Sequence, residues 1–343
     1  MRKTVLVGLS GGVDSALTAA LLQREGYDVI GLYCIMHDTD ASGLEDAKKV
    51  AAHLNIDLQT ADLRTRFDGI VVADFLENYA HARTPNPCIV CNPAVKFKAL
   101  CDRADELGIL HVATGHYAQI TRNQASGRYC VKTVRDKDQS YMLYRLEQNQ
   151  LSRILFPLAN TRKEDNRRLA QELCLPVFEK PDSQDICFIK NESYVDYIER
   201  RLGAFPEGDF WLKDEDRAVG THKGLIRYTV GQRKNLGIAL GTPVYVSELD
   251  RERNRVVLSR TDVVNSTVIR VNSPVFQGLE PGCNEFTAEA KIRFSAKTAP
   301  CTVTIKDGLL YAVFESPQRA ATPGQSAVFY DREGCILCGG FIQ

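Results

Sequence analysis

The sequence has no excess of charge of either sign, because 43 Lys and Arg residues balance 43 Asp and Glu residues. This balance argues against a constitutively basic nucleic-acid scaffold, whose isoelectric point usually lies above about 9, but it permits local contact with RNA. The chain also lacks any run of the roughly 18 apolar residues that span a membrane. Its first residues pass into a strand-like run without the features of a signal peptide. We therefore expect a cytoplasmic protein with no membrane partner.

Internal repeats, low-complexity segments and the HxH and HExxH metal motifs are also missing, so the six histidines carry no metal signature by themselves. Eleven cysteines remain to be explained. In a chain without an export signal, such a number favours metal or redox chemistry over a disulfide scaffold. Cys335 and Cys338 form a CxxC pair, but residues three apart on a strand face opposite sides, so we expect structural thiols there.

Strand and helix patterns alternate between residues 4 and 120, which predicts an α/β doubly wound parallel sheet. A chain of 343 residues is long enough for two or three domains. Strands are expected at 4–8, 28–35, 57–62 and 111–115, and helices at 15–25, 44–54, 67–79 and 96–107. A hairpin is expected at 119–133, and a helix at 163–174 with Thr161 as its N-cap.

The pattern changes after about residue 203. Short alternating runs separated by Gly, Pro, Asn and Asp predict one or two small antiparallel β domains. These runs cover 243–249, 255–258, 267–271, 287–294, 301–305, 309–314 and 326–330. We place the domains at 1–200, 201–262 and 263–343.

A glycine-rich loop follows the first strand and opens the first helix. Such a loop directs backbone N–H groups and the helix N-terminus at an anion. It lacks the lysine of the GxxxxGK[ST] motif, and it is not GxGxxG. Asp14 can hold a Mg²⁺ ion that bridges phosphates. The loop consists of Gly8, Leu9, Ser10, Gly11, Gly12, Val13, Asp14 and Ser15.

Three cysteines lie in segments suited to chemistry. Thr84–Asn92 is expected to be a stiff loop, in which two prolines precede the CxxC pair Cys88 and Cys91. Cys187 follows in a polar loop far downstream. Loops near helix N-termini or bound metal lower the pKa of a thiol and so make it a nucleophile or a ligand.

The motif SGGVDS resembles the pyrophosphate loop of the ATP pyrophosphatase (PP-loop) superfamily. The ordered set SGGVDS, TPNPCxxCN, ATGHYA, KDQSY, DSQDICF, GQRKNLGI and TPGQSAVFY is similar to that of the bacterial tRNA-specific 2-thiouridylases, from residue 8 to about 330. The resemblance implies ATP-dependent thiolation of the wobble uridine of tRNA. It also implies a PP-loop α/β domain, a small central domain and a C-terminal antiparallel β-barrel that contacts tRNA.

The resemblance also implies roles for single residues. The family's nucleophilic cysteine falls on Cys91 and its persulfide-carrying cysteine on Cys187, while Cys88 stands where many members carry Asp. The loop that contacts the target base falls on Asn86, Pro87 and Cys88. ATP contacts fall on Gly8–Ser15, Cys34 and Gly115. The tRNA-contacting positions are His116, Lys137, Asp138, Gln139, Arg293, Phe294 and Gln325.

Two mechanisms fit these cysteines. In the first, Cys187 receives a persulfide sulfur from a donor, and the uridine O2 is adenylated by Mg²⁺–ATP. The persulfide sulfur attacks C2, directly or after release as hydrosulfide, AMP leaves, and a Cys91–Cys187 disulfide forms. The expected sulfur source of the enzyme is a persulfide relay protein or inorganic sulfide. In the second, Cys88, Cys91 and Cys187 ligate a [4Fe–4S] cluster whose open iron carries sulfide.

Contact with tRNA is expected at local basic clusters, of which Arg233-Lys234 lies in a resembling motif. Tyr117 and Phe294 are candidates for stacking on the flipped base. Two other functions remain open: a PP-loop ligase acting on a small metabolite, and a non-enzymatic RNA-binding or iron–sulfur storage module.

Overall fold

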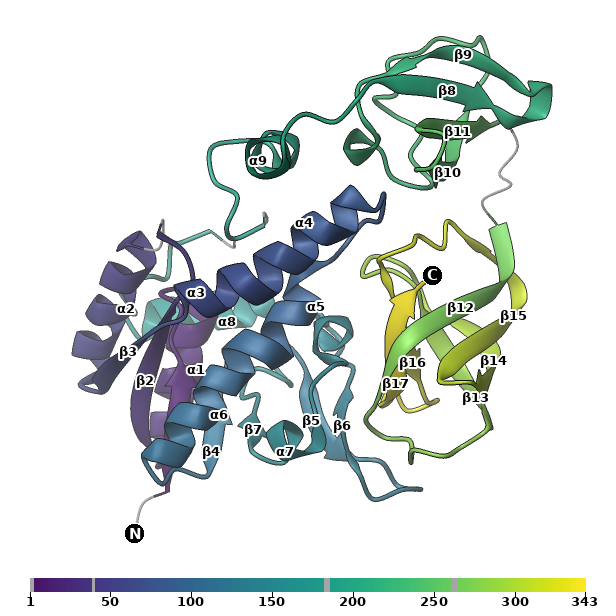
Figure 1. Cartoon of the computed structure of the whole chain (residues 1–343). Coiled ribbons are helices and arrows are strands. Elements are labelled where there is room, and N and C mark those ends of the chain that lie inside the picture. The colour runs from purple at the N-terminus through teal and green to yellow at the C-terminus, as the bar shows by residue number, and fades with distance from the viewer. Residues whose placement is uncertain (1–2, 39–40, 182–185, 261–264) are drawn as a thin grey trace.

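The computed structural model describes residues 3–38, 41–181, 186–260 and 265–343 (Figure 1). Its N-terminal part is built on five parallel strands in the order β3-β2-β1-β4-β7, which confirms the predicted doubly wound sheet. The strands are β1 (Thr4–Gly8), β2 (Asp28–Ile35), β3 (Asp57–Asp62), β4 (His111–Ala113) and β7 (Ile154–Leu155). The strand order reverses between β1 and β4, the place where such sheets bind ligands.

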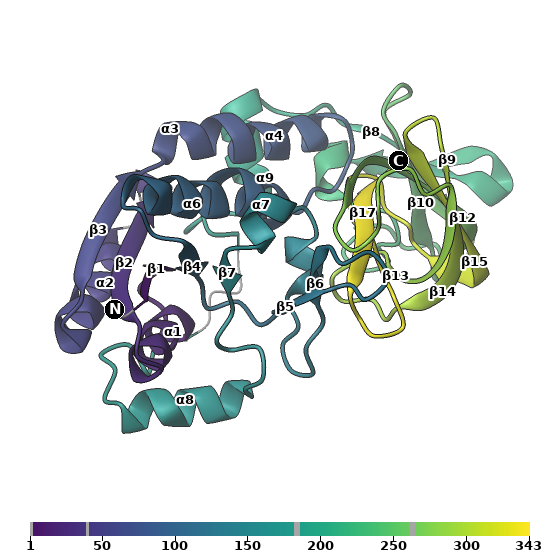
Figure 2. The same cartoon turned by 90° about the horizontal axis from the view of Figure 1, so that it is seen from below.

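Helices cover both faces of this sheet, as Figure 2 shows. On one face lie α1 (Val13–Arg24), α2 (Ala41–Leu54) and α8 (Lys163–Glu172), with Val5, Leu17 and Val50 in their shared core. On the other lies α6 (Phe97–Glu106), whose Phe97 and Leu100 pack with Leu6. The expected N-cap at Thr161 is wrong: its hydroxyl donates to the Leu158 carbonyl, and Arg162 occupies the cap position of α8.

Two long helices contain π-helical turns. The first joins α3 (Arg64–Phe67), η2 (Asp68–Val72) and α4 (Ala73–Ala80), and the second joins α5 (Pro87–Cys91), η3 (Asn92–Lys96) and α6. The expected loop at 84–92 is therefore wrong from Pro87 onward. The Asn86 side chain accepts from the Cys88 N–H, and Pro87 occupies the first helical turn, where it needs no N–H partner.

A hairpin of β5 (Gln119–Arg122) and β6 (Tyr129–Lys132) matches the sequence prediction. Between it and the next domain lie η4 (Ser140–Leu143), α7 (Gln148–Leu151) and α9 (Tyr194–Leu202); the sequence patterns did not reveal α9.

The central domain is a four-stranded sheet in the order β10-β11-β8-β9. Its strands are β8 (Gly208–Leu212), β9 (Arg217–His222), β10 (Tyr245–Asp250) and β11 (Arg255–Ser259), with short 3-10 turns η5 (Lys213–Glu215) and η6 (Leu225–Arg227). The expectation of purely antiparallel pairing is wrong here, because β11 pairs with β8 in parallel. The strands β8 and β9 were not predicted.

The C-terminal domain is a closed antiparallel barrel, as expected. Its strands are β12 (Asn265–Phe276), β13 (Glu285–Lys291), β14 (Ala299–Lys306), β15 (Leu309–Arg319), β16 (Ser326–Tyr330) and β17 (Ile336–Ile342). Barrel residues Val328, Tyr330 and Ile336 belong to the same apolar core as Leu6 and Phe97 of the α/β part. None of the helices in the described ranges has the length and apolar character needed to cross a membrane.

Candidate functional site

The loop between β1 and α1 forms an open anion cradle. Gly12 precedes the first turn of α1, and no side chain caps its N–H groups. The Ser10 N–H donates to the Ser15 hydroxyl oxygen at 3.1 Å, and the Ser15 hydroxyl donates to the Gly12 carbonyl at 3.0 Å. These contacts shape the loop from within and leave the helix N-terminus available to a negatively charged group.

Two glycines bring this loop close to its neighbours. Gly11 has φ +72°, and a Cβ there would lie 2.3 Å from the Gly43 carbonyl oxygen. A Cβ on Gly115 would lie 2.7 Å from the Asp14 carbonyl carbon and 2.9 Å from the Ser15 nitrogen. Gly115 follows β4, so the ends of β1 and β4 meet at the point where the strand order reverses. Cys34, the third predicted nucleotide contact, lies partly buried near the end of β2.

Asp14 is held in a network that the sequence did not reveal. The Lys163 ammonium donates to both Asp14 carboxylate oxygens, at 2.8 and 2.7 Å. The Tyr117 hydroxyl donates to Asp14 Oδ1 at 2.8 Å and accepts from the Asn166 amide at 2.8 Å. Tyr117 is only 2% exposed. The expectation that Tyr117 stacks on a base is therefore wrong, because its ring is buried beside the nucleotide loop.

A second lysine braces the same loop. The Lys180 ammonium donates to the Gly11 carbonyl at 3.0 Å and to Asp46 Oδ2 at 2.8 Å. The bond from Lys180, together with one from Lys49, lowers the pKa of Asp46. Lys163 and Lys180 are both far from the loop in the sequence, so only the fold shows that they reach it. In the sequence, Lys163 stands out only as the neighbour of another basic residue, Arg162.

The two cysteines of the CxxC pair have opposite environments. Cys88 is exposed at the start of α5, whereas Cys91 is only 7% exposed and packs with Phe75 and Val95. Burial raises the pKa of the Cys91 thiol to about 11, and the nearby Lys96 ammonium offsets part of that rise. Cys91 is therefore a protonated thiol near neutral pH in this conformation.

The segment that carries Cys187 packs on the same core as Cys91. Phe188, next to Cys187, contacts Phe75 and Tyr197 with ring centroids 5.3 and 5.4 Å apart. Cys91, Phe188 and Ile189 all belong to this cluster, while Cys187 itself is exposed. The preceding motif residues, 182–185, lie outside the described residues. The fold thus brings two cysteine motifs 96 positions apart to one core beside the nucleotide sheet.

Thr84 joins the CxxC helix to both other domains. Its N–H donates to the Pro323 carbonyl at 2.9 Å, and its carbonyl accepts from the Gln325 amide at 2.7 Å. Its hydroxyl donates to the Thr229 hydroxyl of the central domain at 3.4 Å. Gln325, predicted to contact tRNA, thus uses its amide donor within the protein.

The other predicted tRNA contacts divide into organising and exposed residues. The Asp138 carboxylate accepts from the Ser140 N–H and hydroxyl, and Gln139 accepts from the Tyr117 N–H. Lys137 beside them is exposed. Both Asp138 and Gln139 therefore shape the loop from which Lys137 projects.

His116 is partly buried between Phe97 and Phe156, with ring centroids 5.7 and 5.9 Å away. Desolvation lowers its pKa, so its ring is neutral near pH 7 and is not a cationic phosphate ligand.

In the barrel, Arg293 donates to the Val230 carbonyl and to Thr322 Oγ1, so it joins the central domain to the barrel. Phe294 beside it is 43% exposed, with Lys291 5.5 Å above its ring. Of the two candidate stacking rings, only Phe294 keeps an exposed face.

The predicted cluster ligands do not form a metal site in this conformation. Among the residues that the structure describes, which include all three cysteines, no three His, Cys, Asp or Glu side chains converge as metal ligands would. Asp14, in contrast, suits Mg²⁺, which binds through one or two carboxylates together with substrate phosphates.

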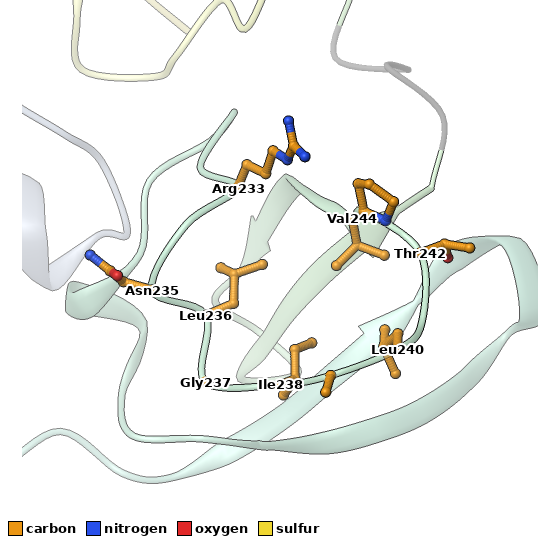
Figure 3. Close-up of a pocket in the computed structure, with 10 residues that line it drawn as sticks. Arg233, Asn235, Leu236, Gly237, Ile238, Leu240, Thr242 and Val244 are labelled. Carbon is orange, nitrogen blue, oxygen red and sulfur yellow. The ribbon is translucent and has the colours of Figure 1, made fainter.

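The two cavities that stand out lie away from these groups. One, of about 440 Å³, is an open pocket of the central domain lined by residues of the segment 233–244, among them Arg233, Leu236, Ile238, Leu240 and Val244 (Figure 3). The other, of about 490 Å³, lies between the β5–β6 hairpin and the barrel and is lined by Asn123, Leu279 and Cys335 among others. Neither includes a residue of the nucleotide loop or the CxxC helix.

The fold and the loop define an α/β nucleotide-binding enzyme followed by two β domains. Residues 3–191 match the family described as tRNA methyl transferase HUP domain, residues 195–260 its PRC-barrel domain, and residues 266–342 the aminomethyltransferase β-barrel domain. The whole chain is 42% identical to the tRNA-specific 2-thiouridylase MnmA of Acetivibrio thermocellus, over 99% of that protein, and 38% identical to that of Clostridioides difficile, over 98%. The chain belongs to the tRNA-specific 2-thiouridylase family and is an enzyme of the sulfurtransferase class.

Solved structures resemble only part of the chain. The U34-tRNA thiolase NcsA from Methanococcus maripaludis, solved with its [4Fe-4S] cluster, has a TM-score of 0.38 and 19% identity, over 58% of this chain and 67% of that one. An NH3-dependent NAD synthetase from Campylobacter jejuni has a TM-score of 0.34 and 22% identity, over 53% and 69%. Likeness at this level does not bear on the ligands of this chain.

Proposed function

We propose that this enzyme thiolates C2 of the wobble uridine of tRNA at the expense of ATP. The observation that carries the proposal is the convergence of two cysteine motifs on one core, which also includes Met36 and Leu63 at the carboxyl ends of β2 and β3 in the sheet that carries the nucleotide loop. A 42% identity to a tRNA-specific 2-thiouridylase over the full chain supports the substrate class.

The first half of the reaction belongs to the nucleotide loop. The uridine O2 attacks the α-phosphorus of ATP, pyrophosphate leaves, and the oxygen is converted into an AMP leaving group. The N-terminus of α1 binds the phosphate oxygens, and Asp14 would hold the Mg²⁺ ion that neutralises them. Gly8–Ser15, Cys34 and Gly115 form the proposed ATP site.

The second half belongs to Cys187 and Cys91. Cys187 carries a persulfide received from a relay protein, and its terminal sulfur attacks C2 while AMP leaves. The Cys91 thiolate then attacks Cys187 Sγ, which releases the 2-thiouridine and forms a Cys91–Cys187 disulfide. A dithiol reductant returns both cysteines to thiols and is itself oxidised to a disulfide. The raised pKa of Cys91 requires a proton acceptor or a change of environment before this step.

The persulfide route fits the structure better than the cluster route. A [4Fe–4S] cluster held by Cys88, Cys91 and Cys187 needs three convergent thiolates, and the described residues contain no such group. In the persulfide route Cys88 does not hold the sulfur atom that is transferred to the uridine. It contributes instead to the lip around the target base, with Asn86 and Pro87.

The deciding experiment incubates the protein with unmodified tRNA, Mg²⁺–ATP and a persulfide donor, and measures 2-thiouridine by mass spectrometry of the digested tRNA. Cys91→Ser and Cys187→Ser should lose multiple turnover, whereas Cys174→Ser, at an exposed cysteine after α8, should keep it. The purified protein should contain less than about 0.1 iron atom per chain, whereas a full [4Fe–4S] cluster would give about four. Absence of thiolated tRNA under aerobic and anaerobic conditions would exclude the proposed function, and AMP release without tRNA would instead indicate a ligase for a small metabolite.

A further inference from the structure

The nucleotide loop of this protein contains no cation of its own. Gly8–Ser15 has no Lys or Arg, whereas a triphosphate brings several negative charges to the loop. The N-terminus of a helix supplies only about half a positive charge. A protein cation from elsewhere in the fold would add to the charge that Mg²⁺ brings to the phosphates.

Lys163 is placed to be that cation. Among the described residues it is the one Lys, Arg, Asp or Glu side chain that is buried, at 6% exposed. A buried charge is costly unless it is paired, and the ammonium here is paired with a carboxylate of the nucleotide loop itself. A role in binding a negatively charged ligand would explain why the Lys163 ammonium is buried at this position.

Neighbouring groups hold the ammonium at the loop. The Lys163 N–H donates to the Asp136 carboxylate at 2.8 Å, which fixes the start of α8. Its ammonium lies 5.7 Å from the centre of the Tyr117 ring. Asn166, one helical turn further along α8, bonds to the Tyr117 hydroxyl. The side chain is therefore directed at the loop from a rigid helix.

Asp14 cannot keep all of these bonds while it ligates a metal ion. Its Oδ1 accepts from both Lys163 and Tyr117, and its Oδ2 accepts from Lys163. A Mg²⁺ ion needs at least one of these oxygens and repels the ammonium. Arrival of Mg²⁺–ATP thus releases Lys163 from Asp14 next to the incoming phosphates.

We propose that Lys163 is the phosphate-binding cation of this site and that Asp14 retains it until Mg²⁺–ATP binds. The proposal rests on the proposed use of ATP and adds to it a residue outside the loop. The ligand is the pyrophosphate portion of a nucleoside triphosphate, which an ammonium binds through charge-assisted hydrogen bonds.

Equilibrium binding of ATP, inorganic pyrophosphate and adenosine, measured by calorimetry in the presence of Mg²⁺, tests this role. Lys163→Met should weaken ATP and pyrophosphate by about 10- to 100-fold, the usual effect of losing hydrogen bonds from a charged group, and leave adenosine within about twofold. Lys48→Met removes the same charge from an exposed lysine of α2 bonded to Glu45, and should change none of the three. Equal losses for ATP and adenosine, or no loss for either, would overturn the proposal.

A second variant keeps the test informative if Lys163→Met does not fold. Asp14→Asn removes the carboxylate that retains Lys163, so ATP without Mg²⁺ should bind about 3- to 10-fold more tightly, while the gain from adding Mg²⁺ disappears. A purely structural ion pair predicts the reverse, a weaker Mg²⁺-free affinity. If the wild-type protein binds no ATP at all, the proposed function itself fails; if it binds ATP and these variants match it, only the role of Lys163 fails.

Discussion

Cys88 and Cys91 are one helical turn apart on α5, yet one faces solvent and the other lies in the core. The family resemblance implied that both take part in the same chemistry, either with Cys91 as the nucleophile and Cys88 in the loop at the target base, or with both as cluster ligands. Their environments differ, because Cys88 is exposed and Cys91 is buried. The Cys91 thiol can react only after the core around it opens or after another group removes its proton. Burial, which depends on Phe75 and Phe188 from distant elements, could not be derived from the CxxC motif.

We predict that alkylation will distinguish these thiols. Iodoacetamide should modify Cys88 and the exposed Cys174 before Cys91. Because the pKa of Cys91 is raised to about 11, its thiolate fraction, and so its rate, should rise about tenfold per pH unit from pH 7 to 10. Peptide mass spectrometry after timed quenching measures this. A rate for Cys91 that levels off below pH 9 would contradict the burial of its thiol.

Gly115 is a second position where a single atom matters. Gly115→Ala would place a Cβ 2.7 to 2.9 Å from the backbone of Asp14 and Ser15, so the loop or β4 must move. We expect a loss of about 1–3 kcal/mol in the free energy of unfolding, together with weaker ATP binding. Gly69→Ala is the control, since a Cβ there meets nothing within 4 Å. Urea unfolding measures both, and equal midpoints for the two variants would refute the close approach.

At the scale of elements, the helix that begins at Pro87 depends on the barrel for its placement. Pro323 and Gln325 bond to Thr84, and Gly324 lies against Arg83 and Thr84. The sequence indicated Gln325 through a motif resemblance and assigned it to tRNA. Its partner in the structure lies 241 residues away, a separation that no local pattern reports.

We predict that Gln325→Leu loosens the segment that leads into the CxxC helix. Hydrogen exchange of the Thr84 and Arg83 amides should accelerate by about 3- to 10-fold, because one hydrogen bond of ordinary strength is lost. Gln318→Leu, at a barrel glutamine bonded to Ser316 on its own strand, should leave these rates unchanged. Exchange at Thr84 that is the same in both variants would show that the barrel does not position this segment.

At the scale of the whole molecule, the barrel and the α/β part share one core. Gln277 is fully buried where they meet: its amide donates to the carbonyls of Leu143, Tyr144 and Leu146, and its oxygen accepts from the Val131 N–H. Nearby, the Tyr141 hydroxyl donates to the Ser326 carbonyl at 2.8 Å. The barrel is therefore an integral part of the catalytic body and more than an appended module.

Gln277→Leu should lower the free energy of unfolding by about 2–4 kcal/mol, because buried backbone groups lose their partners. Gln318→Leu should stay within about 0.5 kcal/mol of the wild type, as substitutions at the surface usually do. Chemical unfolding monitored by circular dichroism measures both. If the two variants have equal stability, the junction does not couple the domains.

The sequence by itself determined the elements whose periodicity is local. The buried runs that became β1, β2 and β3, the hairpin β5–β6 and the glycine-rich loop were all predicted, since side-chain spacing and glycine positions are properties of short segments. The order of the motifs also indicated the family. Only the tertiary structure decided that Lys163 reaches Asp14, that Tyr117 is buried beside it, that Cys91 and Phe188 share a core, and that Gln325 bonds to Thr84. Each of these contacts joins residues between 97 and 241 positions apart, and such contacts form only when sheet, helices and barrel pack together.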